Sequence, residues 1–110
     1  MQSPEKASIA VLPFANMSAD ARQEFFADGI AGDITTNLAR NRWLFVIARN
    51  SSFTYKERTA DIRQAGRELG VRYVLEGSVR RAGARVRVTV QLIEAATGAH
   101  LSSRNILTPI

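Results

Sequence analysis

The sequence predicts an α/β fold, a two-layer sandwich in which a mixed five-stranded sheet carries two helices on one face. Two short runs, residues 8–14 and 43–48, are apolar apart from Ser8, which is typical of strands covered on both sides. A helical pattern follows each run. Residues 72–94 then alternate apolar and polar side chains around one turn, as a hairpin does. The predicted order is therefore β-α-β-α-β-β-β.

The first segment divides into a linker and the start of one domain. Residues 1–7 are polar and contain a proline, so we interpret them as a linker, and residues 8–110 as a single domain large enough for a core. Pro13 ends the first strand because it cannot donate to a ladder. Asp20 with Gln23 three residues later has the form of a capping box.

The first predicted helix runs from this cap to about residues 40–41. Its apolar stripe has steps of four: Phe26, Ile30, Ile34 and Leu38. Gly29 and Gly32 each lower the stability of a helix by roughly 1 kcal/mol relative to alanine. Either the helix restarts at Asp28 as a second N-cap, or the glycines let it approach the sheet closely.

The second predicted helix runs from residue 59 or 60 to Leu69, and Gly70 is placed for a left-handed C-cap. Each helix connects two strands of the first three, which predicts parallel neighbours with right-handed crossovers. From this we place both helices on one face. A turn at 94–98 leads to a last strand that begins at His100.

The hairpin register follows from its turn signal, Ala82-Gly83. A two-residue loop there pairs Arg81 with Ala84, Val79 with Val86 and Leu75 with Val90, and gives one apolar and one polar face. A shift of one residue would set apolar against charged side chains, which period-two alternation does not tolerate.

The composition limits the chemistry. Net charge is +5 with a pI near 10.7, and only Lys6 and Lys56 of the 15 basic residues are lysines. Arginine forks suit phosphate, but arginine-biased codons give the same count. There is no cysteine, no apolar run that could span a membrane, and no signal peptide at the start. We expect a single-domain protein without disulfides and without direct membrane insertion.

Catalytic patterns are missing from the sequence. It contains neither a Gly-x-Ser-x-Gly elbow nor a phosphate loop, and no cluster has metal-ligand spacing. His100 is the only histidine and follows a turn. We therefore predict no catalytic residue, no metal and no cofactor.

The loop after the first strand is the candidate ligand site. Asn16, Ser18 and Asp20 lie between the carboxyl end of a parallel strand and a helix N-terminus, the usual crevice of open α/β sheets. Helix capping alone also explains these residues.

Two further surfaces are candidates for partner binding. Trp43, Phe45 and Ile47 share one face of the second strand, which either docks a partner or is covered by loops and chain ends. The hairpin tip concentrates positive charge that could grip phosphate, lipid headgroups or an acidic partner, or protect a sheet edge: Arg80, Arg81, Arg85 and Arg87. Nucleic-acid binding ranks behind both, because the polar face has no aromatic side chain to stack on bases.

Four segments together resemble the TolB-like amino-terminal domain, in the version found in bacterial proteins with tetratricopeptide repeats or class III adenylate/guanylate cyclase domains. They span residues 8–18 (SIAVLPFANMS), 26–30 (FADGI), 45–53 (FVIARNSSF) and 68–80 (ELGVRYVLEGSVR). The tail, residues 102–110, departs from that family, where a tryptophan and a charged aromatic continuation are expected.

The resemblance implies a non-catalytic regulatory or protein-interaction module of a larger bacterial signalling protein. Its partners would be a second copy or the neighbouring repeat or cyclase domains, without specific nucleic-acid binding. In the membrane-anchored cyclase version the domain would be periplasmic, and otherwise cytoplasmic. The alternative function is a small-molecule or anion sensor that uses the 16–20 loop.

Overall fold

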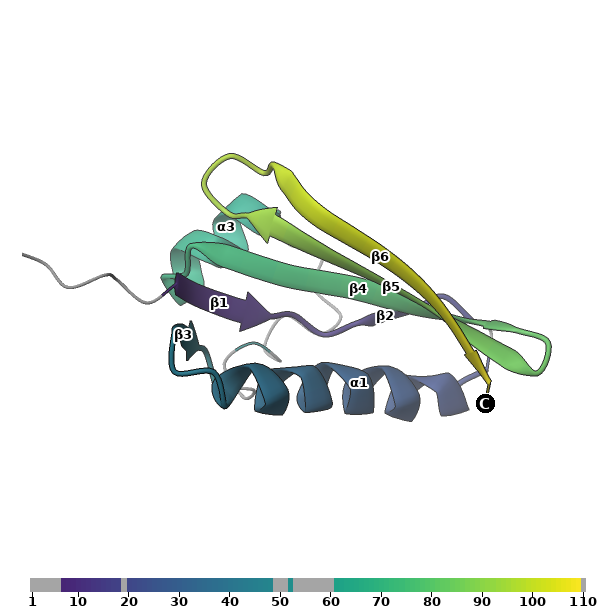
Figure 1. The fold of residues 1–110 in the computed structure, drawn as a ribbon. Helices are drawn as coiled ribbons and strands as arrows, with labels where there is room; N and C mark the ends of the chain where they lie inside the picture. The colour runs from purple at the N-terminus through teal and green to yellow at the C-terminus, as the bar shows by residue number, and fades with distance from the viewer. Residues whose placement is uncertain (1–6, 19, 49–51, 53–60, 110) are drawn as a thin grey trace, which may run out of the picture.

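The computed structural model describes residues 7–18, 20–48, 52 and 61–109. In this part of the chain two helices pack on an open mixed sheet (Figure 1). In chain order the elements are β1 (Ala7–Val11), β2 (Ala15–Asn16), α1 (Arg22–Ala39), β3 (Leu44–Val46), α3 (Ile62–Leu69), β4 (Tyr73–Ala82), β5 (Arg85–Glu94) and β6 (His100–Pro109).

The sheet has the order β3-β1-β4-β5-β6, and β2 pairs with β4 beside β1. The prediction that the first three long strands are parallel neighbours is confirmed, because β1 pairs in parallel with both β3 and β4. The sheet has six strands instead of five because β1 ends at Val11, shortly before Pro13, and the chain pairs again with β4 as β2, after the apolar run 8–14. The α/β class is thus confirmed.

The two helices lie on opposite faces of the sheet, so their predicted placement on one face is wrong. Val74 packs against Ala65 of α3, whereas the adjacent Leu75 packs with the cluster that contains Ala31 of α1. Neighbouring residues of a strand point to opposite faces. The helices lie on opposite faces because the two crossovers run in opposite directions along the sheet. The first goes from β1 outward to β3, and the second returns past β1 to β4. Right-handed crossovers in opposite directions put their helices on opposite faces.

This arrangement buries β1 on both sides. Ala10 and Leu12 belong to the core under α3, and Val11 and Phe14 to the core under α1. The prediction that the apolar run 8–14 is covered on both faces of the sheet is therefore confirmed. Over β1 and β4 the sheet is the middle of three layers.

The hairpin register differs from the predicted one by two residues. Val79 pairs with Val88 instead of Val86, and Ala82 pairs with Arg85, so the turn is Gly83-Ala84. Gly83 has φ +63°, the left-handed conformation that a tight two-residue turn needs and that glycine adopts without steric cost. Because the shift is an even number, each side chain keeps its predicted face.

Helix α1 is continuous through both glycines, so it does not restart at Asp28. An added Cβ at Gly29 would meet open space, which shows that this glycine does not serve close packing. The buried line is Gln23, Ala27 and Ala31. Within the predicted stripe, Ile30, Ile34 and Leu38 flank this line, and Phe26 is 38% exposed.

Helix α3 begins at Ile62, later than predicted. Asp61 is extended and its side chain accepts a hydrogen bond from the Arg63 amide at 3.0 Å, which makes it the N-cap. The predicted starts at 59 and 60 and residues 1–6 of the predicted linker lie outside the described residues, whereas Ala7, predicted as the end of the linker, begins β1. Gly70 has φ +68° and is the C-cap, as predicted.

Gly66 of α3 sets how closely this helix approaches the sheet. A Cβ at Gly66 would overlap the Cβ of Ala95, the residue after β5. Both residues are buried. Helix α3 and the segment after β5 are therefore in such close contact at Gly66 that no methyl group fits between them.

We expect Gly66→Ala to lower the free energy of unfolding by roughly 1–3 kcal/mol, the usual cost of overpacking. Gly29→Ala is the matched control, since it adds the same methyl group to an open helical position and should stabilise by about 0.5–1 kcal/mol. Urea denaturation monitored by circular dichroism measures both. Equal effects of the two substitutions would contradict the proposed close contact.

Candidate functional site

The 16–20 loop is held by hydrogen bonds among its own polar groups. Asn16 Nδ2 donates to the Asp20 carbonyl at 3.1 Å, and Asn16 Oδ1 accepts from the Ser18 amide at 3.0 Å. The Asp20 carboxylate accepts from the Arg22 amide at 2.9 Å and from the Arg22 guanidinium at 3.0 Å. The predicted capping box does not form, because the N-cap is Ala21, which makes no side-chain cap hydrogen bond, and the Gln23 amide donates to the Asp20 carbonyl at 3.0 Å. Asp20 instead makes an Asx-type turn with Arg22 just before the helix.

The loop is also joined to the β4–β5 hairpin. The Arg81 amide donates to Ser18 Oγ at 2.7 Å, and its guanidinium lies 3.4 Å from Asp20 Oδ2. We call Asn16, Ser18, Asp20, Arg22 and Arg81 the hairpin latch. The three residues predicted as a ligand site are thus brought together, and they hold the hairpin to the start of α1. Ligand binding at this loop stays a prediction.

The electrostatics of the latch are concentrated on Asp20. Its hydrogen bonds from Arg22, strengthened by the charges of Arg22 and Arg81, lower its pKa from 3.8 to about 2. The same contact raises the pKa of Arg22. The latch is therefore anionic at its centre, and a bound anion would meet the Asp20 carboxylate.

The hairpin arginines divide between the two faces of the sheet. Arg81 lies on the α1 face within the latch. Arg80 pairs directly with Arg87 on the other face, and Arg85 pairs with Ala82. Arg87 donates to Asn105 of β6 at 3.4 Å. Two like charges directly opposite each other favour an anionic partner or full hydration over close packing.

The apolar set of the second predicted strand also divides. β3 is an edge strand of three residues. Trp43 and Phe45 are 61% and 58% exposed, and Arg42 lies over the Trp43 ring at 5.2 Å. Ile47 packs against the core under α3. Only the two aromatic side chains therefore form an exposed patch, which we call the β3 edge patch.

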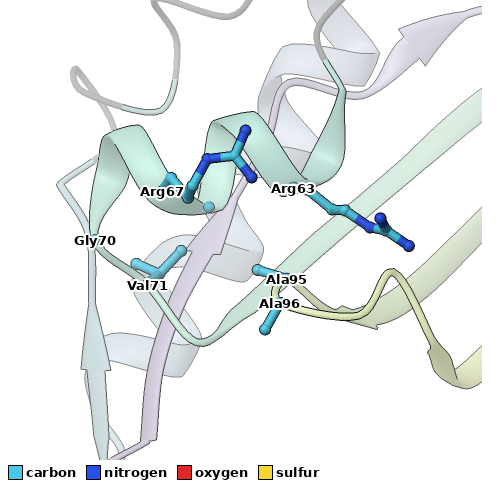
Figure 2. Close-up of a pocket in the computed structure, with 7 residues that line it drawn as sticks. Arg63, Arg67, Gly70, Val71, Ala95 and Ala96 are labelled. Carbon is cyan, nitrogen blue, oxygen red and sulfur yellow. The ribbon is translucent and has the colours of Figure 1, made fainter.

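Sequence reasoning missed a hollow of about 340 Å³ beside α3 (Figure 2). Arg63 and Arg67 project from the helix, and Ala95 and Ala96 lie on the chain after β5 (Figure 2). Arg63 donates to the Thr97 carbonyl at 2.9 Å, which fixes its side chain. The spacing of four between Arg63 and Arg67 places them on one side of the helix, which the sequence could have indicated. The sequence did not indicate that the 94–98 turn lies across from them.

A second hollow, of about 330 Å³, lies between the C-terminal half of α1 and the sheet, and the surface that lines it is apolar. The residues that line it come from five elements, so no local pattern predicts them. They are Ala7, Ile9, Ile34, Leu38, Leu44, Tyr73, Leu75 and Leu92.

Among the described residues, no group of three histidine, cysteine or acidic side chains is placed to hold a metal ion. None of the helices in that part of the chain is both long and apolar enough to cross a membrane.

A family described as HilA/YgeH-like transcriptional regulator, second domain, matches residues 5–108, nearly the whole chain. The chain belongs to this family. It is also 64% identical over 100 residues to "Putative adenylate cyclase 3" of Rhizobium meliloti, with 91% of this chain matched. The chain spans 17% of the length of that relative.

Solved structures share the fold at low sequence identity. A lipoprotein, GNA1162 from Neisseria meningitidis, aligns with a TM-score of 0.76 and 19% identity over 92% of this chain and 81% of its own. TolB from Acinetobacter baumannii aligns with a TM-score of 0.67 and 19% identity over 96% of this chain and 24% of its own. The resemblance to TolB-like domains is thus confirmed at the level of the fold.

The Asp20 carboxylate should stabilise the fold in a pH-dependent way. Its folded pKa of about 2 lies below the ordinary 3.8, so the stabilisation is complete above about pH 4 and is lost as pH falls toward 2. Asp20→Asn removes the charge and keeps the side-chain shape. We expect its melting temperature to lie below the wild type at pH 7 and to converge with it near pH 2.

Asp33→Asn is the control, because Asp33 is an exposed carboxylate of α1 outside the latch. Thermal melts of the three proteins from pH 7 to pH 2 give the comparison. A gap between wild type and Asp20→Asn that persists unchanged at pH 2 would contradict the role of the charge.

Proposed function

We propose that this domain is a non-catalytic accessory module that binds protein, within a longer signalling protein. The observation that carries the proposal is the β3 edge patch, where two large aromatic side chains are exposed beside an edge of β3 that pairs with no other strand of the described residues. Aromatic residues are enriched among the anchors of protein interfaces. The Arg42 side chain over Trp43 adds a cationic rim.

The architecture of the parent protein is part of the proposal. The 64% identity to a protein named as an adenylate cyclase, together with the short share of it that is matched, supports a domain adjoining a cyclase. We further propose the version with tetratricopeptide repeats and, by analogy with the lipoprotein of the same fold, a periplasmic location. The partner is then a neighbouring domain of the same protein or a second copy.

The single tryptophan makes the test direct. The rest of the parent protein, added as a separate polypeptide, should shift Trp43 emission to the blue in a saturable way as the ring loses contact with water. Phe45→Ser should weaken binding roughly tenfold or more, as truncation of an interface aromatic does.

Phe25→Ser is the matched control. Phe25 is 84% exposed on α1, so it undergoes the same substitution outside the β3 edge patch. Equal weakening by the two variants, or no emission shift at any concentration, would contradict the assignment of this patch.

The hollow beside α3 supports a second candidate function, an anion sensor. Arg67 forms no ion pair with any carboxylate of the described residues, and Arg63 is held in place by Thr97. The floor between them is apolar, with Val71 and Ala95 buried. Two arginine side chains at the rim of an apolar hollow suit an organic carboxylate or phosphate.

Titration with inorganic phosphate and with benzoate, followed by amide chemical shifts in NMR, tests this site. We expect saturable shifts at the amides of Gly66, Gly70 and Ala96. Arg67→Gln should weaken binding roughly tenfold, because it removes a charged hydrogen-bond donor. Arg104→Gln, which removes one exposed charge on β6, should have no effect; equal effects of both variants would indicate unspecific charge attraction.

A further inference from the structure

Strand β6 is the least covered element of the described structure. It is ten residues long and pairs with β5 on one side only, since it is the last strand in the sheet order. Every residue from 101 to 107 is exposed. Both faces carry apolar side chains in water: Ile106 opposite Val88 on the α1 face, and Leu107 opposite Arg87 on the other face.

The outer edge of β6 also has few of the features that protect sheet edges. Natural edge strands are kept short, or carry lysine, proline, inward charges or a covering segment. The other edge strand, β3, has three residues. β6 is long, and its one proline is Pro109 at the very end. It contains no aspartate, glutamate or lysine, and Arg104 is its one arginine. An unpaired row of backbone donors and acceptors on such a strand pairs readily with another strand.

We propose that β6 pairs antiparallel with β6 of a second copy, so that two sheets join edge to edge. The inference rests on the proposed role as a protein-binding module and names one partner, the same chain. A two-fold axis perpendicular to the sheet relates such strands. Opposing residues then share a face, so the axis passes midway between one residue and the same residue of the second copy.

The charge on Arg104 selects the register. An axis at residue 104 would set Arg104 opposite Arg104 of the second copy, which is unfavourable. An axis at Asn105 sets Arg104 opposite Ile106 and Ser103 opposite Leu107 of the second copy. The aliphatic part of Arg104 can then lie along Ile106 while its charge stays in water. Axes at Ser103 and at Ile106 also separate the two Arg104 side chains, but both pair fewer residues of β6 than the axis at Asn105 does.

This register predicts a specific cross-link between two introduced cysteines. The chain has no cysteine of its own, so no other disulfide can form. Asn105 would lie opposite Asn105 at a Cα separation of about 4.5–5.5 Å, within the roughly 4.4–6.8 Å that a disulfide spans. Asn105→Cys should therefore form a disulfide-linked dimer under mild oxidation. Ser103→Cys is the control, since the two copies of residue 103 would be offset by four residues, about 14 Å.

Multi-angle light scattering gives the second readout. Wild type should have twice the chain mass of 12.1 kDa. Ile106→Arg should raise the dimer dissociation constant roughly tenfold, because it sets arginine opposite Arg104 twice. Adding Arg104→Glu to Ile106→Arg should restore the dimer. Ile106 is 52% exposed, so these variants should fold, which circular dichroism checks.

A monomeric wild type whose Asn105→Cys variant forms no cross-link would overturn the proposal, as would equal cross-linking of Asn105→Cys and Ser103→Cys. The β3 edge patch lies at the opposite edge of the sheet. Failure at β6 would therefore leave the Trp43 emission shift intact, whereas failure of the proposed function would remove that shift and leave the cross-link unchanged.

Discussion

The structure depends on the burial of β1 between two helices. Its residues contribute alternately to the two hydrophobic clusters, and both neighbours pair with it in parallel. Because the chain crosses β1 in opposite directions, the covers come from different helices. All other features follow from this centre: β4 and β5 extend beyond the covered region, and the edges fall at β3 and β6.

The hairpin latch lies where the core under α1 meets the tip of the β4–β5 hairpin. On the α1 face Val79 and Val86 are buried, and on the other face Arg80 and Arg87 oppose each other. Ser18 and Asp20 bind Arg81 at the outer end of this core. The polar residues of the 16–20 loop thus have a structural role, and the hollow beside α3 offers guanidinium groups that are not engaged by carboxylates of the described residues.

The candidate surfaces also follow from the order of the strands. A strand in the centre of the sheet shares its backbone groups with two neighbours, whereas β3 and β6 each have one row of backbone groups that pairs with no strand in the described part of the chain. The two edges differ in character. β3 is short and carries aromatic side chains, which suits a side-chain interface, and β6 is long and nearly uncharged, which suits backbone pairing.

The sequence by itself determined the order of the helices and longer strands and the two faces of the hairpin. Alternation around Gly83 defined two faces of the hairpin, and Gly70 ended α3 where a left-handed residue was expected. The tertiary structure alone decided which face each helix covers, because both placements bury the same apolar residues locally. It also decided the two-residue shift of register, which preserves every face, and the meeting of Arg63 with the 94–98 turn. Period-two and period-3.6 patterns specify which side of an element is apolar, and only the packed chain specifies what lies against it.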